Sequence, residues 1–261
     1  MPVFDNKIAL VSASSSGIGR AVSKVLAEDG CRLHIFSRSE GRVSAVAREI
    51  ERTTGRSVNY SHGDMTSLPD MERVVSEVHS VTGDVSFLVI NYGDPKIAPF
   101  LDISGSDWDS AINMFLRTSV HLVRSFLPWM LENGGRIIFV TSLTTKQPMK
   151  GFALSASLRS AVVSLSKVLS LEYSSHNVTF NSISQGFFET PRLRGVAERN
   201  AATGKVSIDE AYRRMRDDIP AGRFGNPEEI GHLVSFLCSD RASYINGTNI
   251  QIDGGFTRFP F

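Results

Sequence analysis

Short runs of apolar and β-branched residues alternate with longer amphipathic stretches along almost the whole chain. The runs that predict strands are residues 7–11, 32–36, 57–61, 87–90, 136–141, 178–183 and 249–252. The stretches that predict helices are 18–28, 41–53, 69–81, 107–131, 155–173, 207–215 and 227–237. Because nearly continuous apolar strands must be covered on both faces, this alternation predicts an α/β fold. We expect a doubly wound Rossmann-type fold, a single parallel sheet of about seven strands with helices on both faces.

The segment 187–220 departs from the alternation. It is polar and rich in arginine, and it contains the helical stretch 207–215. It also follows the sixth predicted strand, at the sheet edge where ligands of such folds bind. We therefore expect one domain over residues 1–261 that carries a candidate substrate lid at 187–220. The alternative for this segment is a solvated helical excursion packed on the domain.

Charge and composition exclude several classes of function. The 28 basic and 27 acidic residues nearly cancel and form no basic stripe, so we expect no nucleic-acid partner. Residues 1–7 lack the pattern of a secretory signal, and no apolar run approaches the ~20 residues of a membrane span. The two cysteines, Cys31 and Cys238, stand far apart in apolar contexts and the histidines lack zinc-site spacing. We expect buried thiols, no metal, no membrane and a cytoplasmic location.

The first predicted strand runs into a Ser- and Gly-rich turn followed directly by a helix. A strand, such a turn and a helix N-terminus form a cradle for a diphosphate, because free N–H groups and the helix dipole point at the anion. The turn predicts cofactor contacts from Ser12, Ser14, Ser16, Gly17, Ile18 and Gly19. If the turn needs a positive φ at Ala13, its Cβ costs on the order of 1 kcal/mol.

This turn resembles the Thr-Gly-x-x-x-Gly-x-Gly turn of the short-chain dehydrogenase/reductase family, with Ser12-Ala13 replacing Thr-Gly. Further matches are Gly63-Asp64, Asn91-Tyr92-Gly93, the stretch 181–190 that contains Gly186 and Thr190, and the C-terminal pattern of 219–255. The resemblance covers nearly the whole chain and is nearest to β-ketoacyl-carrier-protein reductases. It implies that Asp64 binds adenine, that Thr190 holds the nicotinamide amide, and that Asn91, Gly93 and Gly186 also line the cofactor site.

The choice of cofactor depends on the end of the second predicted strand. An acidic residue there would bind the ribose of NAD(H), but this chain has Ser37-Arg38. The guanidinium of Arg38 could pair with a 2′-phosphate, so we expect NADP(H) to be favoured over NAD(H). The alternative is that Arg38 is a solvated residue after a strand.

The proton-transfer site departs from the family at three of four positions. The family uses Asn, Ser, Tyr and Lys, and this chain has Phe115, Ser142, Ser155 and Arg159. An aliphatic hydroxyl is a much weaker acid than a phenol, and a guanidinium with pKa above ~12 does not shuttle protons. Arg159 could still grip the cofactor ribose. Residues 146–148 and 154–159 look like a β-ketoacyl-reductase-like branch of the family, whose members lack the full tetrad.

Two groups are candidates to replace the missing acid. Lys146 follows Ser142 by four residues, and a desolvated Lys beside Arg159 would have a lowered pKa. Tyr92 follows the fourth predicted strand and carries a phenol. The non-catalytic alternatives are that Lys146 is a solvated charge on a loop and that Tyr92 has a packing role.

Two functions remain open from the sequence. The first is an NADP(H)-dependent oxidoreductase for a small carbonyl or alcohol substrate, with a non-standard proton relay. The second is a catalytically inactive nucleotide-binding or scaffold protein. The retained Ser142 and Thr190 favour the first. The stretches 107–131 and 155–173 resemble the dimer-forming helices of the family and the tail 256–261 is aromatic, so we expect a homotetramer or a dimer.

Overall fold

The computed structural model describes residues 3–259, and its centre is one sheet of seven strands in the order β3-β2-β1-β4-β5-β6-β7. The strands are β1 (Ile8–Ser12), β2 (Arg32–Ser37), β3 (Val58–His62), β4 (Phe87–Ile90), β5 (Gly135–Val140), β6 (Val178–Gln185) and β7 (Asn249–Ile252). Every neighbouring pair is parallel, which confirms the predicted fold class. Because β1 pairs with both β2 and β4, the strand order reverses there, and a crevice opens beyond the strand ends.

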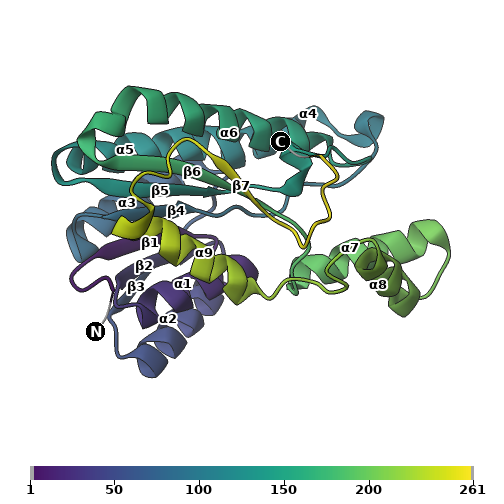
Figure 1. The fold of residues 1–261 in the computed structure, drawn as a ribbon, viewed down its shortest axis with the longest axis horizontal. Coiled ribbons are helices and arrows are strands. Elements are labelled where there is room, and N and C mark those ends of the chain that lie inside the picture. Colours follow the sequence, from purple (N-terminus) through teal and green to yellow (C-terminus); the bar gives the residue numbers. More distant parts are fainter. Residues whose placement is uncertain (1–2, 260–261) are drawn as a thin grey trace.

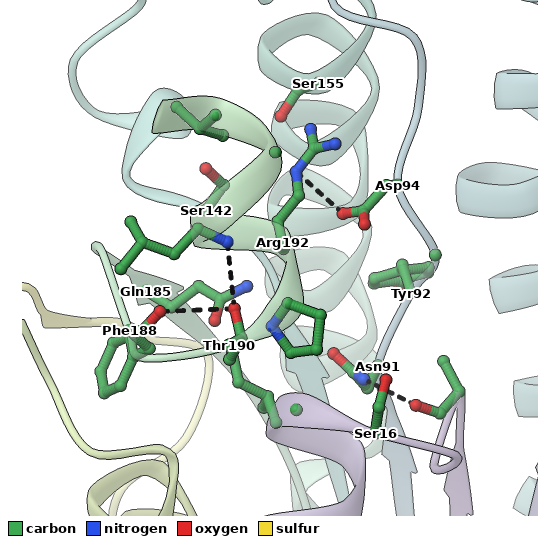
Figure 2. A pocket seen from close by; sticks show the side chains of 18 of the residues that line it. Ser16, Asn91, Tyr92, Asp94, Ser142, Ser155, Gln185, Phe188, Thr190 and Arg192 are labelled. Atoms are coloured by element: carbon green, nitrogen blue, oxygen red, sulfur yellow. Dashed lines mark hydrogen bonds and ion pairs between the residues drawn. The ribbon is translucent and has the colours of Figure 1, made fainter. Parts of the chain in front are cut away.

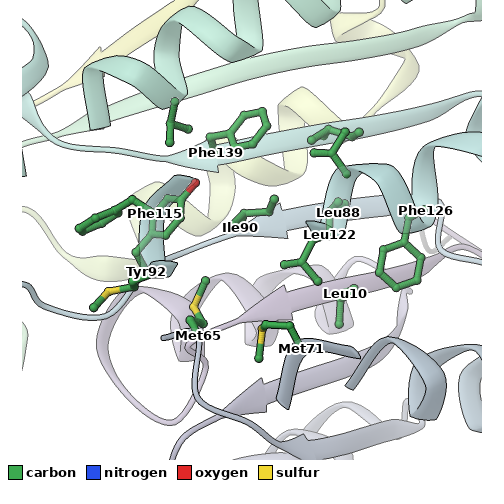
Figure 3. Close-up of a cluster of buried hydrophobic side chains, with 14 of the residues drawn as sticks. Leu10, Met65, Met71, Leu88, Ile90, Tyr92, Phe115, Leu122, Phe126 and Phe139 are labelled. Carbon is green, nitrogen blue, oxygen red and sulfur yellow. The ribbon is translucent and has the colours of Figure 1, made fainter. Parts of the chain in front are cut away.

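Helices cover both faces of the sheet (Figure 1). They are α1 (Gly17–Glu28), α2 (Glu40–Thr54), α3 (Leu68–Glu77), α4 (Gly105–Ile112), α5 (Thr118–Asn133), α6 (Ala153–Tyr173) and α9 (Pro227–Cys238). Successive strand residues point to opposite faces, so Leu10 packs with α3, α5 and α6, whereas Val11 packs with α1, α2 and α9. Figure 3 shows the first of these clusters, in which Phe126 of α5 and Met71 of α3 lie against the strands. The two clusters explain why the strands are apolar on both sides.

The expected uninterrupted helix at 107–131 is wrong in its middle. A π-helical turn, Asn113–Arg117, separates α4 from α5, and the amide N–H of Thr118 bonds the carbonyl of Asn113. The hydroxyl of Ser119 donates to the carbonyl of Phe115, which offers that carbonyl a partner outside the regular helix ladder. The turn carries Phe115, which is fully buried.

The segment 187–220 holds two helices, where the sequence predicted one. They are α7 (Pro191–Gly204) and α8 (Ile208–Asp217), and in Figure 1 they stand away from the sheet at one end. The two helices pack on each other through a small cluster that includes Val196 and Met215. The missed start of α7 has an ordinary signal, since Thr190 caps the helix and Pro191 occupies its first position. The lid role of this segment stays a prediction.

One helical stretch in the described residues, Ala153–His176, is long and apolar enough to cross a membrane, with a mean hydropathy of 1.2. It is α6 and the turn that follows it. Its residues Leu154, Leu158 and Val162 are buried in the core cluster on one face of the sheet. Burial in the core accounts for the apolar residues at the start of this helix, whereas Val168 and Leu171 further along it are exposed.

The structure bears on two further expectations, the buried thiols and the oligomer. Cys31 and Cys238 are both buried and free, and burial raises the pKa of both thiols, that of Cys238 to about 12, which disfavours the nucleophilic thiolate. Exposed apolar side chains, Val120 on α5 and Val168 and Leu171 on α6, lie on the helices for which dimerisation is expected. The homotetramer or dimer, and the cytoplasmic location, stay predictions.

A buried histidine lies in the middle of β2 between two hydroxyl groups. The ring nitrogens of His34 lie 2.7 Å from Thr82 Oγ1 and 2.7 Å from Ser61 Oγ. Burial lowers the pKa of His34 from 6.5 to about 4. The ring is therefore neutral in the folded protein at pH values where the unfolded chain would already be protonated.

This difference predicts acid sensitivity. The lowered pKa contributes stability that is present above the unfolded pKa of 6.5 and is lost as the pH falls towards 4. We expect the free energy of unfolding to fall by about 3 kcal/mol over that interval from His34 alone. Urea denaturation between about pH 7 and about pH 4 measures it, with His34→Gln as the control that lacks the titration. Equal pH slopes in the two proteins would contradict the expectation.

Candidate active site

A cavity of about 490 Å³ lies beyond the carboxyl ends of the strands, at the point where their order reverses. The predicted cofactor residues that line it are Ser16, Gly17, Ile18, Arg38, Asp64, Asn91, Gly93, Arg159, Gly186 and Thr190. The predicted catalytic residues that line it are Tyr92, Ser142, Ser155 and Arg159. Four predicted cofactor residues, Ser12, Ser14, Gly19 and Ser37, lie behind the lining. In Figure 2, Ser16 and Asn91 mark one end of the cavity, and Ser142 and Ser155 mark the other.

The turn after β1 is shaped by residues that do not themselves face the cavity. Ser12 Oγ donates to the carbonyl of Asn91 at 2.6 Å, and Ser14 Oγ donates to the carbonyl of Val11 at 2.9 Å. At Gly19 a Cβ would lie 2.4 Å from the carbonyl oxygen of Ala13, so only glycine allows α1 to pack this closely on the turn. These contacts hold the N-terminus of α1 at the cavity wall. Ser16 caps that helix without a side-chain hydrogen bond, which leaves its first N–H groups available to an anion.

Ala13 has the positive φ at which we expect its Cβ to be unfavourable. Its φ is 50°, in the left-handed region that a Cβ disfavours. Gly17 in the same turn has a φ of 53° and no such cost. The turn therefore stores strain at one residue where the resembling family has glycine.

Cationic and polar side chains line the cavity beyond the carboxyl ends of β2 and β3. Arg38 and Ser39 follow β2, and Arg42 lies in the first turn of α2. The sequence prediction missed Arg42, although the predicted helix 41–53 starts shortly after Arg38 and places Arg42 in its first turn. Ser37 is buried, and its hydroxyl bonds the carbonyl of Ser39 at 3.5 Å, so it supports the loop from behind. One oxygen of Asp64 accepts two hydrogen bonds from Thr66, which fixes its carboxylate at the wall.

Thr190 and Gly186 position the segment that closes the other wall. Thr190 Oγ1 donates to the carbonyl of Phe188 at 3.3 Å and accepts from the N–H of Leu193 at 3.4 Å (Figure 2). A Cβ at Gly186 would lie 2.6 Å from the Cβ of Asp253, so the backbone approach there requires glycine. The start of α7 is thereby anchored beside the nucleotide turn, and the Thr190 methyl group would lie 3.3 Å from a Cβ at Gly17.

Three hydroxyl groups connect the inner end of the cavity to Arg159. Nη1 of Arg159 donates to Ser155 Oγ at 2.6 Å, Ser155 Oγ lies 3.1 Å from Thr144 Oγ1, and Thr144 Oγ1 donates to Ser142 Oγ at 3.1 Å. A hydroxyl has one proton to donate. Because Thr144 gives its proton to Ser142, Ser155 must donate to Thr144. The chain thus runs in one direction from the guanidinium, and the proton of Ser142 remains free for a group in the cavity. The sequence prediction missed Thr144, the middle member.

Arg159 is a buried cation that rests on an aromatic ring. Its side chain is 7% exposed, and its guanidinium carbon lies 4.4 Å from the centroid of the Phe115 ring. It takes part in no ion pair within residues 3–259, and its Nε has no hydrogen-bond partner there. Burial lowers the pKa of Arg159 from 12.5 to about 10, which still leaves it charged at neutral pH. Phe115 therefore supports the cation at the position where the family resemblance implies a polar relay.

The geometry favours neither of the two substitute acids. The hydroxyl of Tyr92 lies 2.7 Å from Ser119 Oγ, and the Tyr92 ring packs 5.0 Å from that of Phe115 within the core (Figure 3). Burial raises the pKa of this phenol, so it is a poor proton donor, and its hydroxyl is already engaged away from the cavity. Lys146 ends a short helical turn after Ser142 and does not line the cavity.

Comparisons with known proteins agree with this fold. A family model described as enoyl-(acyl carrier protein) reductase matches residues 12–257. The 3-oxoacyl-[acyl-carrier-protein] reductase FabG of Aquifex aeolicus is 30% identical over 253 residues, covering 97% of this chain and 98% of that protein. The structure of L-sorbose reductase from Gluconobacter frateurii, complexed with NADPH and L-sorbose, has a TM-score of 0.93 at 27% identity and covers 99% of this chain and 100% of its own. A variant of actinorhodin polyketide ketoreductase with NADPH has a TM-score of 0.92 at 28% identity, covering 97% and 98%.

The strain at Ala13 yields a direct test. Replacing Ala13 by glycine removes the Cβ from a left-handed position, so we expect Ala13→Gly to raise the free energy of unfolding by about 1 kcal/mol. Urea denaturation at neutral pH measures the change. Ala202→Gly, at an exposed site in α7, is the matched control and should lower stability by about 1 kcal/mol. A destabilised Ala13→Gly protein would show that the turn does not carry this strain.

Proposed function

The chain belongs to the short-chain dehydrogenase/reductase family, and on that premise we propose that it is an NADP(H)-dependent oxidoreductase acting on a small carbonyl or alcohol substrate. The observation that carries the proposal is the directed hydroxyl chain, which ends with a free proton on Ser142 in the same cavity as the nucleotide cradle. A protein that only bound a nucleotide would have no need of an ordered chain at the far end of the cavity.

The residues present fit a dinucleotide phosphate. The uncapped N-terminus of α1 and the positive φ of Gly17 form a diphosphate cradle, and Gly19 admits no side chain between helix and turn. Arg38 and Arg42 bring two guanidinium groups to the adjoining wall, where a 2′-phosphate would need them. When bound, NADPH supplies the hydride. The two solved relatives with NADPH support this choice of cofactor.

In this proposal the residues of the chain act on the substrate oxygen. Ser142 donates its free proton in a hydrogen bond to the carbonyl oxygen and stabilises the negative charge that develops there. Thr144 and Ser155 pass the influence of the Arg159 cation to Ser142, since each hydroxyl that accepts a hydrogen bond becomes a stronger donor. Arg159 keeps its proton throughout. The alkoxide takes its proton from a water molecule of the cavity, and the resulting hydroxide leaves to solvent, so the step is balanced without a side-chain acid.

Cofactor choice can be tested at the cationic wall. We expect the Arg38→Gln, Arg42→Gln double variant to bind NADPH about tenfold to a hundredfold more weakly, because two charge-assisted hydrogen bonds to the 2′-phosphate are lost. Binding of NADH should change little. Fluorescence titration of each cofactor measures both constants, with Arg48→Gln, an exposed site further along α2, as the control. Wild-type protein that binds NADH as tightly as NADPH would refute the assignment.

The hydroxyl chain has a kinetic signature. With the best substrate of a ketone, aldehyde and ketoacyl-thioester panel, Ser142→Ala should lower kcat by about a hundredfold or more. Ser155→Ala interrupts the chain and should lower kcat by about tenfold with KM nearly unchanged. Ser157→Ala, an exposed neighbour on α6, is the control. Because none of the three hydroxyl groups, nor Arg159, titrates near neutral pH, kcat should stay level between about pH 6 and about pH 9.

Two results would contradict this mechanism. A bell-shaped profile of kcat with a midpoint near neutral pH would reveal a titrating acid. Uniform failure of the panel, in protein that binds NADPH, would favour an inactive nucleotide-binding protein.

A further inference from the structure

Arginine side chains gather at the substrate end of the cavity. Arg159 and Arg192 both line that end, and the only carboxylate beside them in the described lining is Asp94. Nε of Arg192 lies 3.1 Å from Oδ1 of Asp94, and a dashed line marks this ion pair in Figure 2. Two cations and one anion leave this end with a net charge of one positive. The other lining carboxylate, Asp64, follows β3 on the nucleotide side.

The uncompensated charge belongs to a buried group. Arg159 is 7% exposed, and its Nε has no partner in the described chain. A buried cation that forms no ion pair is costly: burial lowers the pKa of Arg159, the charge of Asp94 raises it in part, and the neighbouring Arg192 lowers it further. An anion placed between the two guanidinium groups would offset this cost. The fold keeps the charge in place without supplying that anion.

A third arginine and a helix end extend the positive field. The guanidinium of Arg199 lies 5.3 Å from the centroid of the Phe152 ring, and that ring lines the cavity. Burial and the charge of Arg192 lower the pKa of Arg199. Arg192 itself stands in the first turn of α7, where no acidic residue offsets the positive end of the helix dipole. The positive end of the α7 dipole and the Arg192 guanidinium therefore both favour an anion at the start of α7.

The ion pair between Arg192 and Asp94 can open without great cost. Their side chains are 36% and 54% exposed, and a pair of that kind contributes about 0–1 kcal/mol. Asp94 follows β4, whereas Arg192 belongs to the segment 187–220. An incoming carboxylate could replace Asp94 on Arg192 by exchanging one anion for another.

We propose that the natural substrate carries a carboxylate, which binds Arg192 in the field of Arg159 and displaces Asp94. This inference rests on the proposed oxidoreductase function and narrows its substrate to keto or hydroxy acids. A carboxylate monoanion balances the one uncompensated charge among the lining groups Arg159, Arg192 and Asp94. Met149, Phe152 and Val196 line the same region, so the rest of the substrate is apolar.

Matched acids and esters test the proposal. Phenylpyruvate and levulinate, each beside its methyl ester, are offered to the protein with NADPH, and consumption of NADPH gives kcat/KM. We expect the acids to be preferred about tenfold or more. Arg192→Gln should remove that preference by raising KM for the acids only, and Asp94→Asn should lower KM for the acids. Arg194→Gln is the control, since Arg194 lies on the same helix turn but pairs with Glu198 on the exposed face.

A binding measurement separates this inference from the proposed function. The thermal midpoint of the NADPH-bound protein is measured with each acid, each ester and inorganic phosphate. Acids that raise the midpoint in wild type and Arg194→Gln, but not in Arg192→Gln, support the carboxylate site even if no carbonyl is reduced. Equal turnover of acids and esters overturns the inference and leaves the oxidoreductase function standing. Stronger stabilisation by phosphate than by the acids also overturns it.

Discussion

The buried guanidinium of Arg159 is the interaction on which the candidate site depends. It lies 4.4 Å from the centroid of Phe115 and donates to Ser155 at 2.6 Å. A guanidinium has donors and no acceptor, so Ser155 accepts from Arg159. Because Thr144 gives its single proton to Ser142, Ser155 donates its own proton to Thr144. The proton of Ser142 is left free for the cavity because Ser142 accepts from Thr144. The same charge also gives the substrate end of the cavity a net positive charge.

The fold brings these groups together by strand ends and helix spacing. Ser142 follows β5, whereas Ser155 and Arg159 lie four residues apart on α6 and so share one face of that helix. The π-helical turn before α5 supplies Phe115, whose ring contacts Arg159. β5, α6 and the π-helical turn all pack in the same core cluster on one face of the sheet. Core packing therefore sets the distances between Arg159 and the three hydroxyl groups, which lie where the core meets the cavity.

Most strands and helices could be predicted from the sequence, because apolar periodicity is a local property. The π-helical turn could not be, since a pattern with a 3.6-residue period does not reveal one extra residue in a turn. Ser142 and Asn91, which follow strand ends, were predicted to face the site from the family resemblance, and the parallel topology agrees because it brings the carboxyl ends of β4 and β5 together. Thr144 was missed because its hydroxyl reaches Ser155 only through the short helical turn after β5. The direction of the Tyr92 phenol was decided by Ser119, on a helix distant in sequence.

The departures from the family pattern at 115, 155 and 159 form one physical arrangement. An aromatic ring at 115 offers no polar partner, but its face favours a delocalised cation, and arginine stacks on rings better than lysine does. A serine at 155 is too short to reach far into the cavity, yet its hydroxyl meets the planar fork of Arg159 at 2.6 Å. Each residue alone would be a poor substitute for the family residue, whereas together they satisfy one another. Such a site stabilises negative charge on an oxygen through a permanent cation, and its action does not require an ionisable side chain tuned to neutral pH.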